Sequence, residues 1–268
     1  MKKLCAALMT SLLVLIAGCS KKQPVAADAR TESQTDVQAD AVKPASGKFL
    51  ASTSWTAGFM DIAGIDDVQT VAPANLRHPP EYEVTVSDIQ KINGSTYFVY
   101  AGFERMMKIL SDSVKADSRM IKIKCDNSIQ TVSEEARNLA EIFGTQRECE
   151  RRIAEYRAVI ENGKKNMKGK GLSSAKALCN KNQIYLAKEL GFDVVLVFGP
   201  GEVTSEQIAF AKSQDFVFII DNVHNPVAGP LLEVAPKAKY LVWRNFPESV
   251  SRGALKKMVA NNIDMLFE

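Results

Sequence analysis

Short apolar runs alternate with segments of helical period from about residue 48 to residue 268. Eight runs bounded by turn residues have the length and composition of strands: 49–53, 68–72, 96–101, 120–124, 175–179, 194–198, 216–220 and 240–244. Strands that alternate with helical segments predict parallel sheets whose faces are covered by helices. The expected fold class is therefore α/β, with a mostly parallel sheet in each half of this region.

The segments between the strands carry helix signals. Phe103, Met106, Met107 and Leu110 have the i, i+3, i+4, i+7 spacing of one helix face. Ser87 followed by Gln90 has the form of a capping box, which predicts a helix start. Helices are also expected at four places in the second half: 181–190, from about Thr204, around 230–234, and 255–266.

The middle of the chain has no strand signal. Two amphipathic faces lie on either side of Gly144, and the other faces of this stretch, roughly 133–167, are heavily charged. Such a segment is typical of a long helix that joins two lobes. We therefore expect an N-terminal lobe at 48–132, a connecting helical segment at 133–168 and a C-terminal lobe at 169–268.

The N-terminus has the form of an export signal. Lys2 and Lys3 precede an apolar run at 4–17, and the run ends Leu15-Ile16-Ala17-Gly18-Cys19, which resembles the lipobox of bacterial lipoproteins. This predicts a signal peptide at 1–18, a lipid on Cys19, and an exported protein anchored to a membrane, in the periplasm or at the cell surface. The alternatives are an incidental cysteine after an ordinary signal, or a membrane helix, for which the run is short of the roughly 20 residues needed.

Residues 19–47 are polar and poor in large apolar side chains, so a flexible tether is expected there. The formal net charge of +3 includes Lys2 and Lys3, so the exported protein is close to neutral and has no signature of nucleic-acid binding. We find no nucleophile elbow, no zinc-protease helix and no phosphate loop. An enzyme is therefore not expected.

The chain has five cysteines, of which Cys5 lies in the predicted signal and Cys19 is the predicted lipid site. Cys125, Cys149 and Cys179 remain, and an odd number outside the cytoplasm implies at least one free thiol. A Cys125–Cys179 disulfide is possible, and the sequence does not decide it.

Three segments resemble a known family, the solute-binding lipoproteins of zinc and manganese ABC importers (ZnuA/TroA-like). They are 80–89, which ends Val86-Ser87-Asp88-Ile89, then 96–104, and 180–191, which ends Lys188-Glu189-Leu190-Gly191. Together with the central helical segment, the likeness extends over nearly all of residues 48–268. It implies two lobes that close on a metal ion, a monomeric protein, and delivery of the ion to an ABC permease.

The family usually holds its ion with about four ligands, chiefly histidines with one or two carboxylates, whereas this chain has two histidines in all. The first family histidine aligns with Pro80, and Asn180 stands where the second lobe normally presents a ligand. The family site is therefore absent or rebuilt. Candidate ligands for a rebuilt site are His78, His224 and Asp221, at predicted loop positions beyond strand ends. Two imidazoles and a carboxylate suit zinc, and more oxygen ligands suit manganese.

Each candidate has an ordinary alternative. The histidines can be loop residues that cap neighbouring backbone, and Asp221 can cap a helix. Cys125 and Cys179 rank below them as ligands, because buried inert thiols are common. Trp55 and Trp243 either line the cleft or fill the core. The alternative function is a surface lipoprotein that binds no metal and instead binds a partner or an organic ligand.

Overall fold

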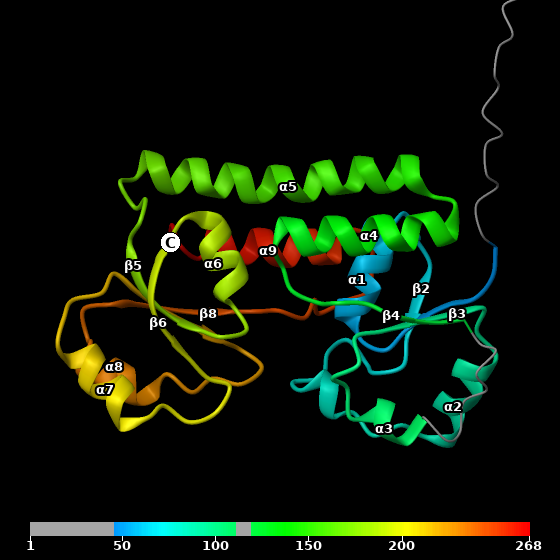
Figure 1. The fold of residues 1–268 in the computed structure, drawn as a ribbon, viewed down its shortest axis with the longest axis horizontal. Helices are drawn as coiled ribbons and strands as arrows, with labels where there is room; N and C mark the ends of the chain where they lie inside the picture. The colour runs from blue at the N-terminus through cyan, green and yellow to red at the C-terminus, as the bar shows by residue number, and fades with distance from the viewer. Residues whose placement is uncertain (1–45, 111–118) are drawn as a thin grey trace, which may run out of the picture. The chain divides into compact units, whose positions relative to one another are not determined.

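Two four-stranded parallel sheets form the framework of the protein (Figure 1). The first contains β1 (Phe49–Ala51), β2 (Val68–Thr70), β3 (Tyr97–Tyr100) and β4 (Arg119–Lys122), in the order β2-β1-β3-β4. The second contains β5 (Lys176–Asn180), β6 (Asp193–Phe198), β7 (Phe218–Asn222) and β8 (Lys239–Trp243), in the order β6-β5-β7-β8. The predicted α/β class with two lobes is confirmed, and every predicted strand starts within two residues of an observed one.

The computed structural model describes residues 46–110 and 119–268. All described elements belong to one compact unit, residues 42–268. The predicted signal peptide, Cys19 and all but the last two residues of the predicted tether lie outside the described residues. Within the described ranges, no helix combines the length and the apolar character that a bilayer crossing requires.

Helices cover both faces of each sheet. Their bounds are α1 (Ser54–Ile62), α2 (Val86–Asn93), α3 (Met106–Leu110), α4 (Ile129–Phe143), α5 (Gln146–Gly169), α6 (Ile184–Leu190), α7 (Ser205–Lys212), α8 (Gly229–Val234) and α9 (Ala254–Asp264). Strand residues alternate between the two faces, as the period of two requires. Leu50 and Phe98 pack on the α2 and α3 side, whereas Ala51 and Val99 join the core under α1, α4 and α5.

The large core continues under the second sheet. Cys179, Phe218 and Ile220 contribute to it from β5 and β7, and α5, α6 and α9 cover it. A third, smaller core lies between the second sheet and helices α7 and α8. Figure 1 shows α4, α5 and α9 together on one side of the two sheets, with α2, α3, α7 and α8 on the other. One helical layer thus spans both lobes.

The connecting segment is two helices rather than one. Gly144 ends α4 with a left-handed φ of 69°, a conformation that glycine adopts without a Cβ penalty. Helix α5 begins at Gln146, runs back beside α4, and continues to α6 and α9 in the second half. The predicted connecting segment is therefore not one continuous helix. A long helix does join the two halves as expected, and it is α5.

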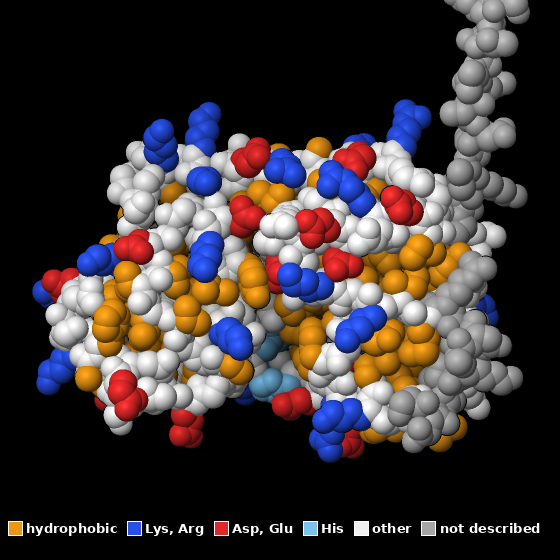
Figure 2. All heavy atoms as spheres, in the orientation of Figure 1, with side chains coloured by type: hydrophobic (Ala, Val, Ile, Leu, Met, Phe, Trp, Pro, Cys, Tyr) orange, Lys and Arg blue, Asp and Glu red, His pale blue; other side chains and the backbone are white. Residues whose placement is uncertain are grey.

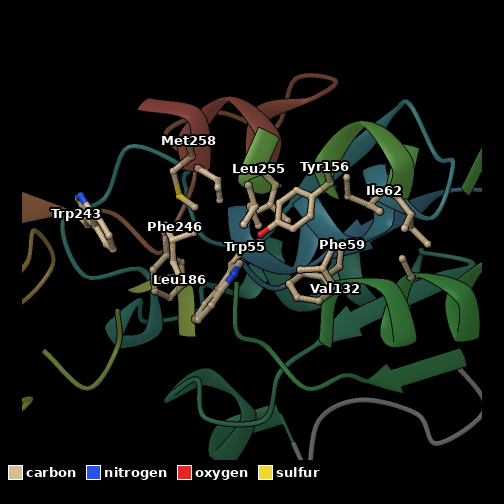
Figure 3. Close-up of a cluster of buried hydrophobic side chains, with 14 of the residues drawn as sticks. Trp55, Phe59, Ile62, Val132, Tyr156, Leu186, Trp243, Phe246, Leu255 and Met258 are labelled. Atoms are coloured by element: carbon tan, nitrogen blue, oxygen red, sulfur yellow. The ribbon is translucent and has the colours of Figure 1, made fainter. Parts of the chain in front are cut away.

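Helix α1 was not predicted. Its N-cap is Thr53, which forms a capping box with Thr56, and all nine of its residues are buried. Trp55, Phe59 and Ile62 lie on one of its faces, and Figure 3 shows them in the core with side chains from the second half of the chain. This helix occupies the space directly after β1 and helps to join the two halves.

The other caps follow their local sequence. The box expected at Ser87 lies two residues earlier, between Thr85 and Asp88, so α2 begins at Val86. The expected cap near Thr204 is present as a capping box with Gln207. These contacts satisfy backbone N–H groups that the first helical turn leaves open.

Candidate ligand-binding site

The carboxyl ends of the central strands carry polar residues in both lobes. In each sheet the strand order reverses between the two central strands, β1 and β3 in the first and β5 and β7 in the second. Loops at such a reversal diverge and leave space for a ligand in open α/β sheets. Asn180 ends β5, and Asp221 and Asn222 end β7, so these residues are the first to consider.

Asp221 is fully buried, and both carboxylate oxygens are used inside the protein. Oδ1 accepts hydrogen bonds from Asn180 Nδ2 at 2.9 Å and from the backbone N–H of Asn222 at 2.8 Å. Oδ2 accepts from the backbone N–H groups of Val227 and Ala228, at 2.9 and 2.8 Å, and from the Tyr240 hydroxyl at 3.3 Å. Ala228 is the N-cap of α8, so Asp221 fixes the loop that leads into this helix.

Two further buried carboxylates near strand ends are also engaged. Glu104 accepts hydrogen bonds from Ser52 Oγ and from the backbone N–H groups of Ala101 and Gly102. Asp126 accepts from Ser128 and from Thr131 Oγ1 at the start of α4. All three carboxylates therefore hold loops in place.

His224 lies in the loop after β7 and is 7% exposed. Its Nδ1 donates a hydrogen bond of 2.7 Å to the backbone oxygen of Arg77, in the loop after β2. A carbonyl only accepts, so the proton of the neutral ring lies on Nδ1 and Nε2 carries a lone pair. Nε2 is buried without a hydrogen-bond partner among the described residues.

The surroundings keep this imidazole neutral. Burial lowers the pKa of His224, and the hydrogen bond to the Arg77 carbonyl partly opposes that shift. The nearby charges of Arg244 and His78 lower the pKa further. The Phe246 ring packs edge-on against the imidazole, with centroids 5.1 Å apart, and the Phe246 backbone partly opposes the lowering of the pKa. His224 therefore offers an unprotonated nitrogen at neutral pH.

His78 lies close to His224 and is half-buried. It precedes a short 3-10 turn, Pro79–Glu81, and its side chain makes no capping hydrogen bond there. Figure 2 shows the histidine side chains together at a hollow between the lobes. The structure thus brings together the two predicted histidines, one from each lobe.

The three predicted metal ligands do not form a cluster. Within the described ranges, no three His, Cys, Asp or Glu side chains come together in a way that could hold a metal ion. Cys125, Cys149 and Cys179 are all free, so the possible Cys125–Cys179 disulfide is not formed. Burial raises the pKa of each of these thiols, to about 11 for Cys149, which disfavours the thiolate form that binds metals.

A pocket of about 540 Å³ opens beside His224. Its first wall is the loop after β2, with Asn75 and Arg77, and its second wall comes from β8 and the segments after β7 and β8, with Tyr240, Arg244 and Glu248. Arg244 pairs with Glu248 at 2.7 Å. This volume lies in the range of small-molecule sites. Neither arginine lies in a motif, so the sequence did not point to them.

Buried amides adjoin the same region. Gln183 Nε2 donates to the Trp243 backbone oxygen at 3.1 Å and to Asn222 Oδ1 at 3.4 Å, and Asn222 Oδ1 also accepts from the His224 backbone. Gln183 Oε1 and Asn245 Oδ1 have no hydrogen-bond partner among the described residues. Asn180, Asn222 and Asn245 all stand at or just after the ends of strands, a regularity that could have indicated them.

The tryptophans belong to the core rather than to an open cleft. Trp55 is 6% exposed, donates from Nε1 to Asn127 Oδ1 at 2.8 Å, and packs against Phe246 with ring centroids 4.9 Å apart. Trp243 is fully buried. Figure 3 shows Trp55 and Phe246 side by side, where α1 of the first half meets the segment after β8.

Comparison with solved structures identifies the fold as that of metal-binding solute-binding proteins. The SBP (solute-binding protein) FpvC from Pseudomonas aeruginosa in complex with Mn²⁺ matches with a TM-score of 0.63 and 15% identity, over 82% of this chain and 97% of that chain. An Mn-bound periplasmic metal-binding protein from Candidatus Liberibacter asiaticus matches with a TM-score of 0.59 and 18% identity, over 82% and 98%. No family model and no curated protein sequence matches the chain.

Proposed function

We propose that this protein is a solute-binding lipoprotein, not an enzyme, that captures a divalent metal between its lobes and delivers it to an ABC permease. The observation that carries the proposal is the buried Nε2 of His224, which has no hydrogen-bond partner among the described residues. Its ring bonds a loop of the other lobe, in a fold shared with metal-binding proteins. The lipobox-like segment that ends at Cys19 supports export and anchoring to a membrane.

The geometry around His224 is suited to metal binding. Metal-ligating histidines usually donate their other ring N–H to a carboxylate or carbonyl, which fixes the tautomer and the ring orientation. The Arg77 carbonyl does this for His224. A metal binds only the unprotonated nitrogen, and the lowered pKa of His224 provides it without the release of a proton at neutral pH.

The proposal retains His78 and His224 as metal ligands and gives Asp221 a different role. With both oxygens already bonded, Asp221 positions the loop that carries His224. Zinc and manganese remain the proposed metals, because imidazole suits zinc and the remaining positions would be taken by oxygen.

A second candidate is a lipoprotein that binds an organic solute without a metal. It is favoured by Arg77 and Arg244 in the pocket and by the lack of a free carboxylate among Glu104, Asp126 and Asp221.

Elemental analysis of the purified protein, followed by thermal unfolding with zinc and with manganese, tests the proposal. We expect about one equivalent of metal and a melting temperature that rises with metal concentration, because a ligand that binds only the folded state stabilises it by mass action. His224→Ala should abolish the rise and His78→Ala should reduce it. Tyr185→Phe, an exposed change on α6, is the control. Absence of metal and of any shift would refute metal capture.

A further inference from the structure

We propose that the pocket binds its metal as an anionic chelate, a small organic molecule whose carboxylates supply most of the metal ligands. This inference rests on the proposed function and names its substrate class. Arg77 and Arg244 would hold carboxylates of the chelator, and His224 Nε2 would complete the coordination of the metal.

The charge of the pocket favours an anion over a bare cation. Its lining has two guanidinium groups, Arg77 and Arg244, and one carboxylate, Glu248, which already pairs with Arg244. Arg77 is exposed and has no ion pair with any described residue. These charges favour an anion over a bare divalent ion, because the planar fork of arginine binds carboxylates through two parallel hydrogen bonds.

The protein provides too few metal ligands of its own. Zinc sites use about four ligands, and manganese prefers several oxygens. The buried carboxylates near the strand ends, Glu104, Asp126 and Asp221, are all bonded to loop backbone or hydroxyl groups. The missing ligands must therefore arrive with the metal.

Arg77 and Arg244 line the same pocket as His224. The backbone oxygen of Arg77 bonds His224 directly, and the charge of Arg244 acts on the same ring. The backbone of Arg244 is fixed by two hydrogen bonds with Asn262, of 3.0 and 2.8 Å. Apolar side chains complete the lining: Leu76, Val223, Pro226 and Val242. A volume of about 540 Å³ accommodates an organic molecule and far exceeds one ion.

Isothermal titration of the purified full-length protein compares Mn²⁺ alone, citrate alone and equimolar Mn²⁺ with citrate as the probe chelate. We expect the chelate to bind at least about tenfold more tightly than either component. Arg77→Gln and Arg244→Gln should each weaken chelate binding by about tenfold or more. Arg105→Gln, which removes an exposed arginine paired with Glu83 outside the pocket, should not. His224→Ala should reduce chelate binding to the level of citrate. Thermal melts verify that each variant folds.

The outcomes separate this inference from the proposed function. If Mn²⁺ alone binds as tightly as the chelate, and the two arginine variants match the parent, the inference is wrong while metal capture stands. If citrate alone binds as tightly as the chelate and His224→Ala has no effect, the ligand is a metal-free anion and the inference is again overturned. If manganese binds in neither form and citrate does not bind, the inference is overturned, and the proposed function fails as well if zinc also gives no thermal shift.

Discussion

Nδ1 of His224 lies 2.7 Å from the backbone oxygen of Arg77, although 147 residues separate the two in the sequence. The bond links the loop after β7 to the loop after β2, and so connects the two lobes where their strands end. Arg77 contributes through its backbone, so substitution of its side chain leaves the bond intact. The contact can be removed only from the His224 side.

His224→Phe should retain the ring that packs on Phe246 and lose the bond to Arg77. We expect the free energy of unfolding to fall by about 1 kcal/mol, the typical net value of one hydrogen bond. Urea denaturation monitored by circular dichroism measures it. The His78 side chain makes no capping hydrogen bond, so His78→Phe should reduce the free energy of unfolding by less. Equal losses in the two variants would show that His224 does not stabilise the protein through its bond to Arg77.

Arg152→Met should destabilise the protein by about 3–5 kcal/mol, because it leaves a buried carboxylate without its partner. Arg152 is almost fully buried on α5 and donates to Asp61 Oδ1 and to the Asp61 backbone oxygen, both at 2.8 Å. Arg151→Met on the exposed side of the same helix is the matched control and should cost far less, because solvent screens exposed ion pairs. Chemical denaturation compares them, and similar losses for both would contradict the assignment.

Glu148 should contribute stability that disappears in acid. Its hydrogen bond to Arg151, with further help from Arg152, lowers its pKa to about 2, below its ordinary value of 4.5. A carboxylate with a lowered folded pKa stabilises the protein above its unfolded pKa, and this contribution is lost as the pH falls from about 4.5 to about 2. Glu148→Gln should therefore be less stable than the parent at pH 7, by a small and salt-sensitive amount since the group is partly exposed. The difference in melting temperature between the parent and Glu148→Gln should disappear by about pH 2. A difference that does not change with pH would contradict stabilisation by the ion pairs of Glu148.

Gly163→Ala should reduce stability by about 1–2 kcal/mol despite the better helix propensity of alanine. A Cβ at Gly163 would lie 2.7 Å from Ile263 Cγ2 and 3.1 Å from Leu190 Cδ2, where α5 meets α9 and α6. At Gly169, at the end of the same helix, an added Cβ would have no atom within 4 Å, so Gly169→Ala should be neutral or slightly stabilising. Thermal unfolding of the two variants tests this: if Gly163→Ala is as stable as Gly169→Ala, the close approach at Gly163 does not determine the effect of the added methyl group.

Cys125, Cys149 and Cys179 should react slowly with a thiol reagent in the folded protein. Burial raises the pKa of each, so little thiolate is present at pH 8. Labelling followed by peptide mass spectrometry should find these three modified only after denaturation, with no disulfide among them. Rapid labelling of Cys179 in the native state would contradict the burial of its side chain, which points from β5 into the large core.

The strands were predictable because central parallel strands are buried on both faces and appear as short continuous apolar runs. Helix α1 was not predictable by the same means. All nine of its residues are buried, so it has no exposed polar face. Gly144 in the sequence marked a possible helix end. That α5 then runs back beside α4 depends on tertiary packing, which the local sequence does not show.

The site was only partly predictable. The approach of His78 to His224 followed from their positions beyond strand ends in a two-lobed fold. It was not predictable that hydrogen bonds would occupy both oxygens of Asp221. Three of these bonds come from backbone N–H groups, and the sequence does not show where a backbone N–H group will point. Arg77 and Arg244 reach one pocket from segments far apart in the chain, and no spacing rule joins them.

The packing of α9 on α1 imposes an order of events on a chain that is made from its N-terminus. Gly58 lies against Leu255, and the backbone N–H of Gly253 donates to Asp61 at 2.9 Å across 192 residues. The burial of α1 is therefore complete only after α9 has been made. Such distant contacts form slowly because a long loop must close first. The core of the first lobe accordingly reaches its final packing late, although most of its residues are made early.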